Sequence, residues 1–205
     1  MLKIWGRTTS INVQKVLWCA DELGVAYERI EAGGKFGVVD TPEYRRANPN
    51  GLVPLIDDDG FVLWESNAIV RYLCGKHGMG GLAPADPQWR ADADRWMDWQ
   101  MGTFTAAMSI AFRQLLRGAP ELRNAAEIEI SRRKSEDAAA ILDRHLEGRD
   151  YIAGAAFTMG DIPVALAAHR WLGLPLARQE RPNIERWHAA LQARPRAGVL
   201  SFPVA

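Results

Sequence analysis

The stretch from residue 53 to residue 73 reads VPLIDDDGFVLWESNAIVRYL, and it predicts the fold around it. Two apolar runs, 53–56 and 61–64, flank a turn sequence of three aspartates and a glycine, which is typical of an antiparallel hairpin. The second run leads directly into Ser66, a residue type that caps helices, and apolar side chains at helical spacing follow to about Gly75. We therefore expect a β-hairpin whose second strand runs straight into a helix.

The residues before this hairpin predict alternating strands and helices. Residues 2–5 form a short apolar strand, residues 12–23 carry apolar side chains at helical spacing, and residues 25–30 alternate as a second strand. The segment 31–47 has a looser pattern and ends at the turn sequence Asn48-Pro49-Asn50-Gly51. The predicted order over this part of the chain is strand, helix, strand, helix, strand, strand, helix.

The composition changes after the helix that follows the hairpin. Glycine and proline crowd residues 78–87, as in a linker between domains, and no strand pattern follows. Helical patterns cover residues 88–117, 121–147, 160–172 and 183–193. We therefore predict a mixed α/β domain over residues 1–77, a linker over 78–87 and an all-helical domain over 88–205.

The charge balance excludes one broad class of function. Lys plus Arg total 25 and Asp plus Glu total 25, so the formal net charge is zero. A non-specific nucleic-acid binder carries a large basic excess that neutralises phosphates. No nucleic-acid partner is therefore expected.

The sequence is typical of a cytosolic protein without a membrane partner. Its N-terminus shows no secretory signal pattern, and no apolar run approaches the ~20 residues that span a bilayer. Cys19 and Cys74 lie far apart and form no Cys-x-x-Cys pair. We expect two buried, reduced thiols and no metal site.

Val53-Pro54 is the first of three features that carry chemistry. A proline removes a hydrogen-bond donor from a strand, so it is expected at the edge of a sheet or beside an irregularity in the strand. If its peptide bond is cis, the N–H and C=O of Val53 face outward and can pair with an extended peptide. The alternative is an ordinary trans proline at a sheet edge.

The second feature is Glu65-Ser66, where a strand runs into a helix. Free N–H groups at the helix start, the Ser66 hydroxyl and the helix dipole suit a carboxylate, and Glu65 offers a negative charge to an amine. Together they suit the end group of an α-amino acid. The alternative is that Ser66 only caps its helix.

The third feature is the loop from the first strand into the first helix, which contains Thr9, Ser10 and Asn12. Hydroxyl and amide donors at a helix N-terminus can stabilise an anion such as a thiolate. The alternative is ordinary helix capping.

In this order and spacing, these features resemble the glutathione transferase superfamily, specifically its bacterial branch. The resemblance covers nearly the whole chain and rests on residues 48–55 (NPNGLVPL), on residues 65–73 (ESNAIVRYL) and on Thr158-Met159-Gly160-Asp161-Ile162. It implies a thioredoxin-like first domain followed by a helical-bundle second domain.

The resemblance also implies which residues bind glutathione. It implies a cis Pro54, with Val53 pairing to the cysteinyl backbone of the tripeptide. Glu65 and Ser66 then hold the γ-glutamyl end. Lys35, in the loop before the second helix, is the candidate for the glycine carboxylate.

The first loop decides the expected catalytic residues. Family members that activate the thiol with a tyrosine carry it in this loop, whereas the first tyrosine here is Tyr27. The loop is most similar to the bacterial types that use a Thr or Ser together with an Asn. We therefore expect Asn12 and Ser10 to act together, with Thr9 as the third candidate. The Ser-x-x-Cys motif of the zeta-type isomerases is absent from the loop.

The implied activity is transfer of glutathione to a small hydrophobic electrophile, with glutathione as co-substrate and no metal or organic cofactor. Two alternatives stay open: a glutathione-dependent reductase of disulfides or peroxides, and a non-enzymatic binding protein of the same fold. The resemblance also implies a homodimer, because it places the active site beside a subunit interface.

Two further patterns lie in the predicted helical domain. Large side chains on its first helix either contact the second substrate or form core; they are Met101, Phe104, Met108 and Phe112. Thr158 and Asp161 have the spacing of a capping box, which predicts a structural and not a catalytic role.

Overall fold

The computed structural model describes residues 1–202, and its first part contains strands and helices in the predicted order. They are β1 (Leu2–Trp5), α1 (Ile11–Leu23), β2 (Tyr27–Ile30), the short 3-10 turn η1 (Gly34–Phe36), α2 (Pro42–Ala47), β3 (Leu55–Asp58), β4 (Phe61–Trp64) and α3 (Ser66–His77). The predicted α/β part is confirmed, because the periodic apolar patterns and the turn residues that mark these elements are local signals.

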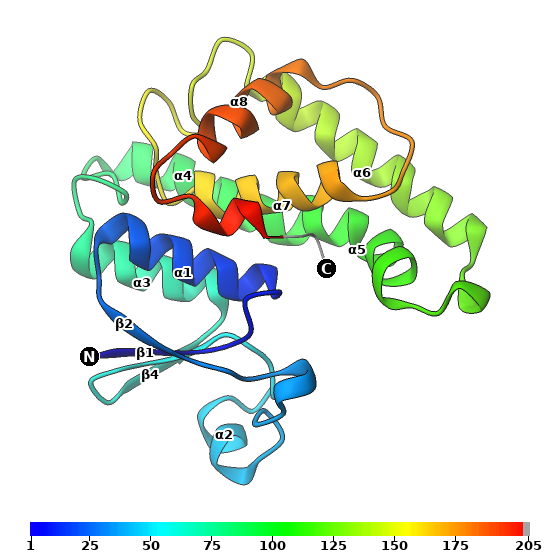
Figure 1. Cartoon of the computed structure of the whole chain (residues 1–205). Helices are drawn as coiled ribbons and strands as arrows, with labels where there is room; N and C mark the ends of the chain where they lie inside the picture. The colour runs from blue at the N-terminus through cyan, green and yellow to red at the C-terminus, as the bar shows by residue number, and fades with distance from the viewer. Residues whose placement is uncertain (203–205) are drawn as a thin grey trace.

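The four strands form one mixed sheet in the order β2-β1-β3-β4. The central strand β1 pairs in parallel with β2, where Ile4 lies opposite Arg29, and antiparallel with β3, where Ile4 lies opposite Ile56. Helices α1 and α3 lie on one face of the sheet and α2 lies on the other (Figure 1). This arrangement is the thioredoxin-like architecture that the resemblance implied.

The hairpin between β3 and β4 turns through two residues, Asp59 and Gly60, and both have positive φ (52° and 95°). Two-residue hairpin loops with positive φ at both positions match the twist of the strands that they join. The sequence pattern placed the turn at residues 57–60, but β3 continues to Asp58. The reason is that Asp58 is buried and accepts hydrogen bonds from Lys76 Nζ (2.6 Å) and the Tyr72 hydroxyl (2.7 Å) of α3.

The rest of the described chain, up to residue 202, is mainly helical, as predicted. It contains α4 (Pro87–Trp99), a π-helical segment η2 (Gln100–Thr105), α5 (Ala106–Phe112), a second π-helical segment η3 (Arg113–Arg117), the 3-10 turn η4 (Pro120–Leu122), α6 (Ala125–His145), α7 (Asp161–Gly173), α8 (Pro182–Gln192) and the 3-10 turn η5 (Gly198–Ser201). The single long helix predicted over 88–117 is therefore interrupted by two π-helical segments. None of the helices within residues 1–202 has the length and hydropathy to cross a bilayer.

Helix α6 begins later than the sequence pattern suggested. Asn124 is its N-cap, and the Asn124 side chain accepts hydrogen bonds from the backbone N–H groups of Ala126 (3.0 Å) and Glu127 (3.2 Å). Pro120 instead starts the short 3-10 turn η4. The predicted start at residue 121 is therefore wrong by four positions, because the cap residue and not the apolar pattern sets the helix end.

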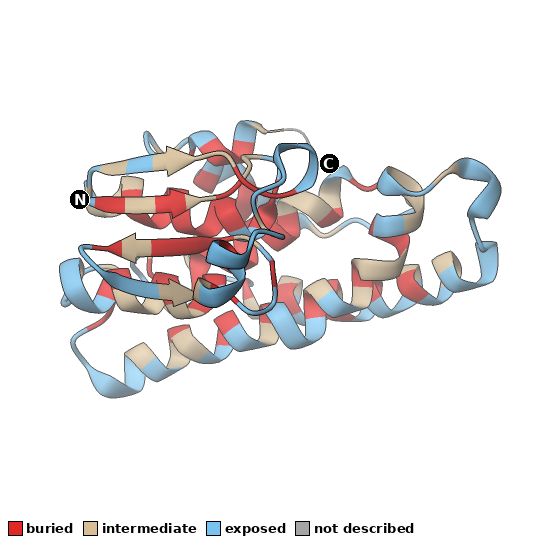
Figure 2. Ribbon diagram, turned by 90° about the horizontal axis from the view of Figure 1, so that it is seen from below, coloured by how far each residue is buried: buried red, intermediate tan, exposed pale blue. Residues whose placement is uncertain are grey.

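Helix α1 lies between the sheet and the helical part of the chain, and it packs against both α3 and α7. Val13, Val16 and Trp18 of α1 are completely buried, and Figure 2 shows the buried residues gathered between the sheet and the helices. The domain limits 1–77, 78–87 and 88–205 stay a proposal. Helix α3 ends at His77 and α4 begins at Pro87, so the glycine-rich residues connect these two helices.

Two arginines that follow α8 form hydrogen bonds with the C-terminal end of α1. Arg194 donates two hydrogen bonds to the Glu22 carboxylate (3.0 and 2.9 Å). Arg196 Nη1 donates to the backbone carbonyls of Asp21 (2.8 Å) and Glu22 (2.7 Å), which lie in the last turn of α1. The Asp21 carbonyl also accepts from the Gly24 N–H (3.1 Å). Carbonyls in the last turn of a helix lack partners within that helix, so Arg196 binds groups at the end of α1 that the helix itself leaves unpaired.

Candidate functional site

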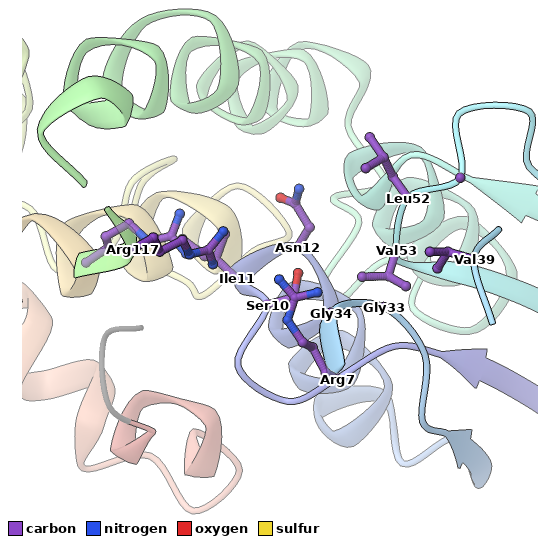
Figure 3. Close-up of a pocket in the computed structure, with 12 residues that line it drawn as sticks. Arg7, Ser10, Ile11, Asn12, Gly33, Gly34, Val39, Leu52, Val53 and Arg117 are labelled. Atoms are coloured by element: carbon purple, nitrogen blue, oxygen red, sulfur yellow. The ribbon is translucent and has the colours of Figure 1, made fainter. Parts of the chain in front are cut away.

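A cavity of about 270 Å³ lies where the loop after β1 meets the helical part of the chain. The front part of the chain contributes Arg7, Ser10, Ile11, Asn12, Gly33, Gly34, Val39, Gly51, Leu52 and Val53, and the helical part contributes Arg117 and Arg170. Figure 3 shows Arg117 approaching from one side and Val53, Leu52 and Val39 lying on the other, with Asn12 and Ser10 between them. Three predicted site residues therefore meet here: Ser10, Asn12 and Val53.

Ser10 occupies the N-cap position of α1 in extended conformation (φ −88°, ψ 119°), but its side chain accepts no capping hydrogen bond. The Ser10 hydroxyl therefore does not take part in ordinary helix capping. Asn12, the second residue of α1, is exposed and lines the cavity, and its amide makes no hydrogen bond with any other residue of 1–202. Two polar side chains and the positive end of the α1 dipole thus face the cavity, and within residues 1–202 neither side chain has a hydrogen-bond partner. Thr9 is exposed and does not line the cavity.

The Val53-Pro54 peptide bond is cis, as the resemblance implied. Pro54 lies directly before β3, so its missing N–H removes no hydrogen bond from the sheet. No hydrogen bond joins the backbone N–H or C=O of Val53 to another residue in the described part of the chain. Val53 lines the cavity, so its two backbone groups can pair with an extended peptide in the manner of an added strand.

Glu65 and Ser66 do not line this cavity, and the structure corrects the predicted role of Ser66 as helix cap. The N-cap of α3 is Glu65, whose backbone has positive φ (72°), and Ser66 is the first helical residue. A non-glycine residue at positive φ is uncommon, and such residues gather at functional sites. Glu65 is exposed and Ser66 is buried, so the free N–H groups at the start of α3 lie beside an exposed carboxylate.

Lys15 is a buried cation that the sequence reasoning missed. Its side chain is 2% exposed, and its Nζ donates to Gln100 Oε1 (2.9 Å), Asn67 Oδ1 (3.2 Å) and, more weakly, Ser66 Oγ (3.5 Å). Burial, with Arg170 as the second cause, lowers the pKa of Lys15 to about 7, and Glu65 opposes that fall. A lysine inside the apolar run of α1 was the available signal, because lysine is almost never buried without polar partners.

Lys35, the predicted partner of the glycine carboxylate, stands in η1 outside the cavity. It is exposed, and its Nζ lies 5.1 Å from the centre of the Phe36 ring. Arg7 lies over the neighbouring glycines instead: a Cβ at Gly33 would come within 3.0 Å of Arg7 Nη1. Sequence reasoning did not single out Arg7, because one arginine in a loop carries no pattern of its own.

The apolar stripe of the long helix belongs to the core. Phe104 and Met108 are completely buried and Phe112 nearly so, whereas Met101 is 51% exposed, and none of the four lines the cavity. Of the two readings left open by the sequence, the core reading therefore holds for the three buried side chains. The wall that the helical part gives to the cavity is formed by arginines.

Two guanidinium groups stack on the ring of Phe112 at this wall. Arg170 lies 3.9 Å and Arg117 4.6 Å from the ring centre. Burial lowers the pKa of Arg170 to about 10, with Arg117 as the second cause, and burial and Arg7 lower the pKa of Arg117. The twelve lining residues from the described part of the chain include three arginines and no carboxylate, so the cavity is strongly cationic.

Asp161 is a buried carboxylate away from the cavity. It accepts hydrogen bonds from the backbone N–H groups of Ile152 (2.8 Å) and Thr158 (2.9 Å), from the Thr158 hydroxyl (3.2 Å) and from Trp187 Nε1 (3.3 Å). The bond to Thr158 N–H is the one that a capping box requires, but the Thr158 hydroxyl donates to the carboxylate instead of accepting from the Asp161 N–H. Burial raises the pKa of Asp161 to about 6, although its four donors oppose that rise. Within residues 1–202, no group of His, Cys, Asp or Glu is arranged to hold a metal ion.

Comparison with known proteins places this site in a family. The family model described as "Glutathione S-transferase, N-terminal domain" matches residues 9–76, and "Glutathione S-transferase, C-terminal domain" matches residues 102–195. The chain is 40% identical over 197 residues to Glutathione S-transferase GstB of Escherichia coli K12, covering 95% of each chain. It is 34% identical over 154 residues to Glutathione S-transferase D7 of Drosophila melanogaster, covering 71% of this chain and 64% of the relative.

A solved structure agrees over the full length. It is the theta class glutathione S-transferase of Xanthomonas axonopodis pv. citri with glutathione bound, which is 42% identical and superimposes with a TM-score of 0.94. The match covers 100% of this chain and 99% of that one. The protein belongs to the glutathione S-transferase family.

Proposed function

We propose that this glutathione S-transferase activates the thiol of glutathione as a thiolate between Ser10 and Asn12, for attack on an electrophilic carbon. One observation carries the proposal. The uncapped Ser10 hydroxyl, the Asn12 amide and the unpaired backbone of Val53 line one cavity at the N-terminus of α1. A thiolate bound there meets two donors and the positive end of a helix dipole.

These groups are sufficient for the activation that the reaction needs. Lowering a thiol pKa by two units requires roughly 2.7 kcal/mol of preferential stabilisation of the thiolate. One or two hydrogen bonds to a charged sulfur supply about 1.5–3 kcal/mol each, and the helix N-terminus adds less than about 1 kcal/mol. Thr9 is the third candidate donor. This assignment makes the chain a bacterial transferase of the type with Ser or Thr plus Asn in the first loop.

In this proposal the tripeptide extends from Val53, which lines the cavity, to the start of α3, which lies outside it. Val53 pairs with the cysteinyl backbone, Glu65 accepts the γ-glutamyl ammonium, and Ser66 with the free N–H groups of α3 receives the γ-glutamyl carboxylate. Lys15 behind Ser66 adds a positive charge on the carboxylate side. Lys35 stays the proposed partner of the glycine carboxylate, and it must swing from its place over Phe36 to reach it.

A three-substrate panel tests the activity. The purified protein is assayed with glutathione and an aryl halide, with a small disulfide and with a hydroperoxide. We expect conjugation of the halide well above the uncatalysed rate. Absence of turnover with all three substrates, in a protein that binds glutathione in calorimetry, would instead support a non-enzymatic binding role.

Reduction of disulfides or peroxides is the second candidate function, and one observation favours it. A glutathione transferase from Burkholderia graminis, which is 27% identical with a TM-score of 0.87, was solved with two glutathione molecules bound per subunit. A reductase needs a second glutathione, which attacks the mixed disulfide that the first forms with a disulfide substrate, or the sulfenic acid that the first forms with a peroxide. In the panel, faster turnover of the disulfide than of the halide would favour this function.

Ser66→Ala should weaken the binding of glutathione by about 1–2 kcal/mol, the scale of a lost hydrogen bond to a charged group. Isothermal titration calorimetry with glutathione measures the change directly. Ser109→Ala is a matched control, because Ser109 lies on α5 outside the cavity and its hydroxyl bonds, among the described residues, only to the Ala106 carbonyl. No detectable binding of glutathione to the unmodified protein at millimolar concentration would contradict the whole proposal.

We also propose a homodimer as the working form. Two-fold symmetric dimers are the commonest assembly of soluble proteins. Trp96, Trp99 and Ile141 line a hollow on α4 and α6, where an indole N–H of Trp96 is buried without a hydrogen-bond partner in the described chain. Light scattering at micromolar concentration should give about twice the monomer mass of 22.8 kDa. A mass near that of one chain would contradict this prediction.

The cytosol is the proposed location. Cys19 and Cys74 are both completely buried free thiols, with their sulfurs 3.5 Å apart. Reduced thiols in such close contact suit a reducing compartment, where glutathione itself is abundant.

A further inference from the structure

We propose that Lys15 is a positioning residue for the γ-glutamyl carboxylate of glutathione, and that binding of the tripeptide draws a proton onto its amine. The inference rests on the proposed function, which places this carboxylate at Ser66 and the start of α3. It adds a group that does not touch the ligand and acts through the Ser66 hydroxyl. The affinity for glutathione then depends on pH near neutrality.

The Lys15 amine lies where three segments of the chain meet. Lys15 belongs to α1, and its Nζ donates to Gln100 Oε1 of η2 (2.9 Å), to Asn67 Oδ1 of α3 (3.2 Å) and, more weakly, to Ser66 Oγ of α3 (3.5 Å). A protonated lysine amine has three N–H donors and no acceptor. Each of its three protons therefore has one acceptor here.

The two amide partners of this amine are held with their oxygens toward it. Asn67 Nδ2 donates to the Met97 carbonyl (2.8 Å), and Gln100 Nε2 donates to the Thr105 hydroxyl oxygen (2.5 Å). Turning either amide over would break that second bond and bring N–H donors against the amine. Of the three partners, the Ser66 hydroxyl is therefore the one that can turn its proton.

The protonation state of the amine decides which way the Ser66 hydroxyl donates. A protonated amine donates to Ser66 Oγ, so the O–H proton points away from it and is available to a carboxylate. A neutral amine keeps two N–H donors for the amides and turns a lone pair toward Ser66, which then donates inward. The ligand's carboxylate would lose both the hydroxyl donor and the positive charge behind it.

The charge on Lys15 has no anionic hydrogen-bond partner in the described part of the chain. Lys15 is 2% exposed, and its three partners within residues 1–202 are neutral oxygens. Burial, with Arg170 of α7 as the second cause, lowers the pKa of Lys15 to about 7, and Glu65 at the cap of α3 opposes that fall. A ligand carboxylate at Ser66 adds a negative charge nearby and therefore favours the protonated amine.

Glu65 and Arg170 are the charged groups that act on Lys15 from the elements packed around α1. The segments η2 (QMGTFT) and η5 (GVLS) carry no titratable side chain, and His77 at the end of α3 is exposed. The other titratable groups of α1, α3 and α7 bond elsewhere: Asp21 to Tyr27, Glu22 to Arg194, Arg71 to Asp94 and Asp98, Tyr72 and Lys76 to Asp58, Cys74 to Cys19, Asp161 to Thr158, and His169 to His188.

Binding of the carboxylate and binding of the proton therefore favour each other. The free protein loses the Lys15 proton as the pH rises through about 7, so a ligand that prefers the protonated form binds less well at high pH. With a preference of about tenfold, binding at pH 7.5 takes up about half a proton, and the affinity falls about sixfold between pH 6.5 and pH 8.5.

S-methylglutathione is the probe, because it has no thiol whose ionisation would add to the proton count. Calorimetry in two buffers with different ionisation enthalpies gives the number of protons taken up on binding. We expect uptake of about half a proton at pH 7.5 and a fall in affinity with rising pH. S-methyl-4-aminobutanoyl-cysteinylglycine lacks only the γ-glutamyl carboxylate; it should bind more weakly and take up almost no proton.

Two variants locate the effect at Lys15. Lys15→Met should bind S-methylglutathione at least about fivefold more weakly at pH 6.5, without proton uptake. Lys15→Arg keeps a cation that does not titrate, so its affinity should stay constant from pH 6.5 to pH 8.5. Lys134→Met is the control, because Lys134 is exposed on α6, and it should behave like the unmodified protein.

The measurement on the unmodified protein needs no variant, so it decides the inference even where a buried substitution prevents folding. Binding of S-methylglutathione without proton uptake would overturn the inference. Equal uptake with the ligand that lacks the carboxylate, or unchanged uptake in Lys15→Met, would do the same. Absence of binding to the unmodified protein would instead contradict the proposed function, so the two failures are distinguishable.

Discussion

Asp161→Ala is expected to lower the free energy of unfolding by about 3 kcal/mol or more, because it leaves several buried donors without an acceptor, each worth about 1–3 kcal/mol. The sequence pattern alone supports only the 1–2 kcal/mol of a lost helix cap. The structure adds the Ile152 N–H (2.8 Å) and the Trp187 indole (3.3 Å), which the sequence spacing does not connect to Asp161. In a chain of this length, 3 kcal/mol corresponds to a fall of about 6–12 °C in the thermal midpoint.

Urea denaturation at pH 7.5 measures the change, with Asp150→Ala as control. Asp150 is exposed and makes no hydrogen bond within residues 1–202, so its replacement should leave the midpoint unchanged. Asp161→Asn keeps one acceptor oxygen and should fall between the wild type and the alanine variant. Loss of activity without any change in the thermal midpoint would show that Asp161 takes part in the reaction and is not structural.

Asn12→Ala and Ser10→Ala should raise the pKa of the bound glutathione thiol and slow conjugation at pH 7. The rate should fall about tenfold for each 1.4 kcal/mol of lost transition-state stabilisation. Asn12→Ala should have the larger effect, because the amide N–H₂ can only donate to the sulfur, whereas the hydroxyl must first orient its proton. The affinity for glutathione should change little, because the tripeptide is held mainly by Val53, Glu65 and Ser66.

The pH–rate profile of each single variant separates these effects. The apparent pKa of the rate should move upward, so the loss in rate should shrink at high pH, where the thiol ionises without help. Gln192→Ala, an exposed amide on α8 outside the cavity, is the control. If both active-site variants keep the apparent pKa and the rate within twofold of wild type, another group activates the sulfur. Backbone N–H groups of the first loop and Arg7 would then be the next candidates.

The elements of the first domain were predictable because their signals are local. The hairpin, the helix that follows it and the order of the strands each depend on neighbouring residues. The errors are local as well. Glu65, at positive φ, takes the cap position in place of Ser66, so α3 starts one residue earlier than expected, and the buried partners of Asp58 lengthen β3.

The sequence predicted cavity residues only from the first part of the chain, not from the helical part. Ser10, Asn12 and Val53 belong to motifs with recognisable spacing, but Arg117 and Arg170 lie 53 positions apart on different helices and meet only in the folded chain. An arginine on a polar helix face looks the same whether it points to solvent or into a cavity. The apolar stripe left core and substrate contact open for the same reason, since periodicity gives the buried face of a helix and not what covers it.

The arginines that close the end of α1 have a consequence for the order in which the protein is made. Glu22 and Arg194 are 172 positions apart, so at about 5–20 residues per second the ribosome adds Arg194 about 10–35 seconds after Glu22. During this interval α1 lacks both its partner helix α7 and the donors that bind its last carbonyls. The first domain to emerge is therefore among the last to complete its structure, and the nascent chain exposes the apolar back of α1 until synthesis is nearly finished.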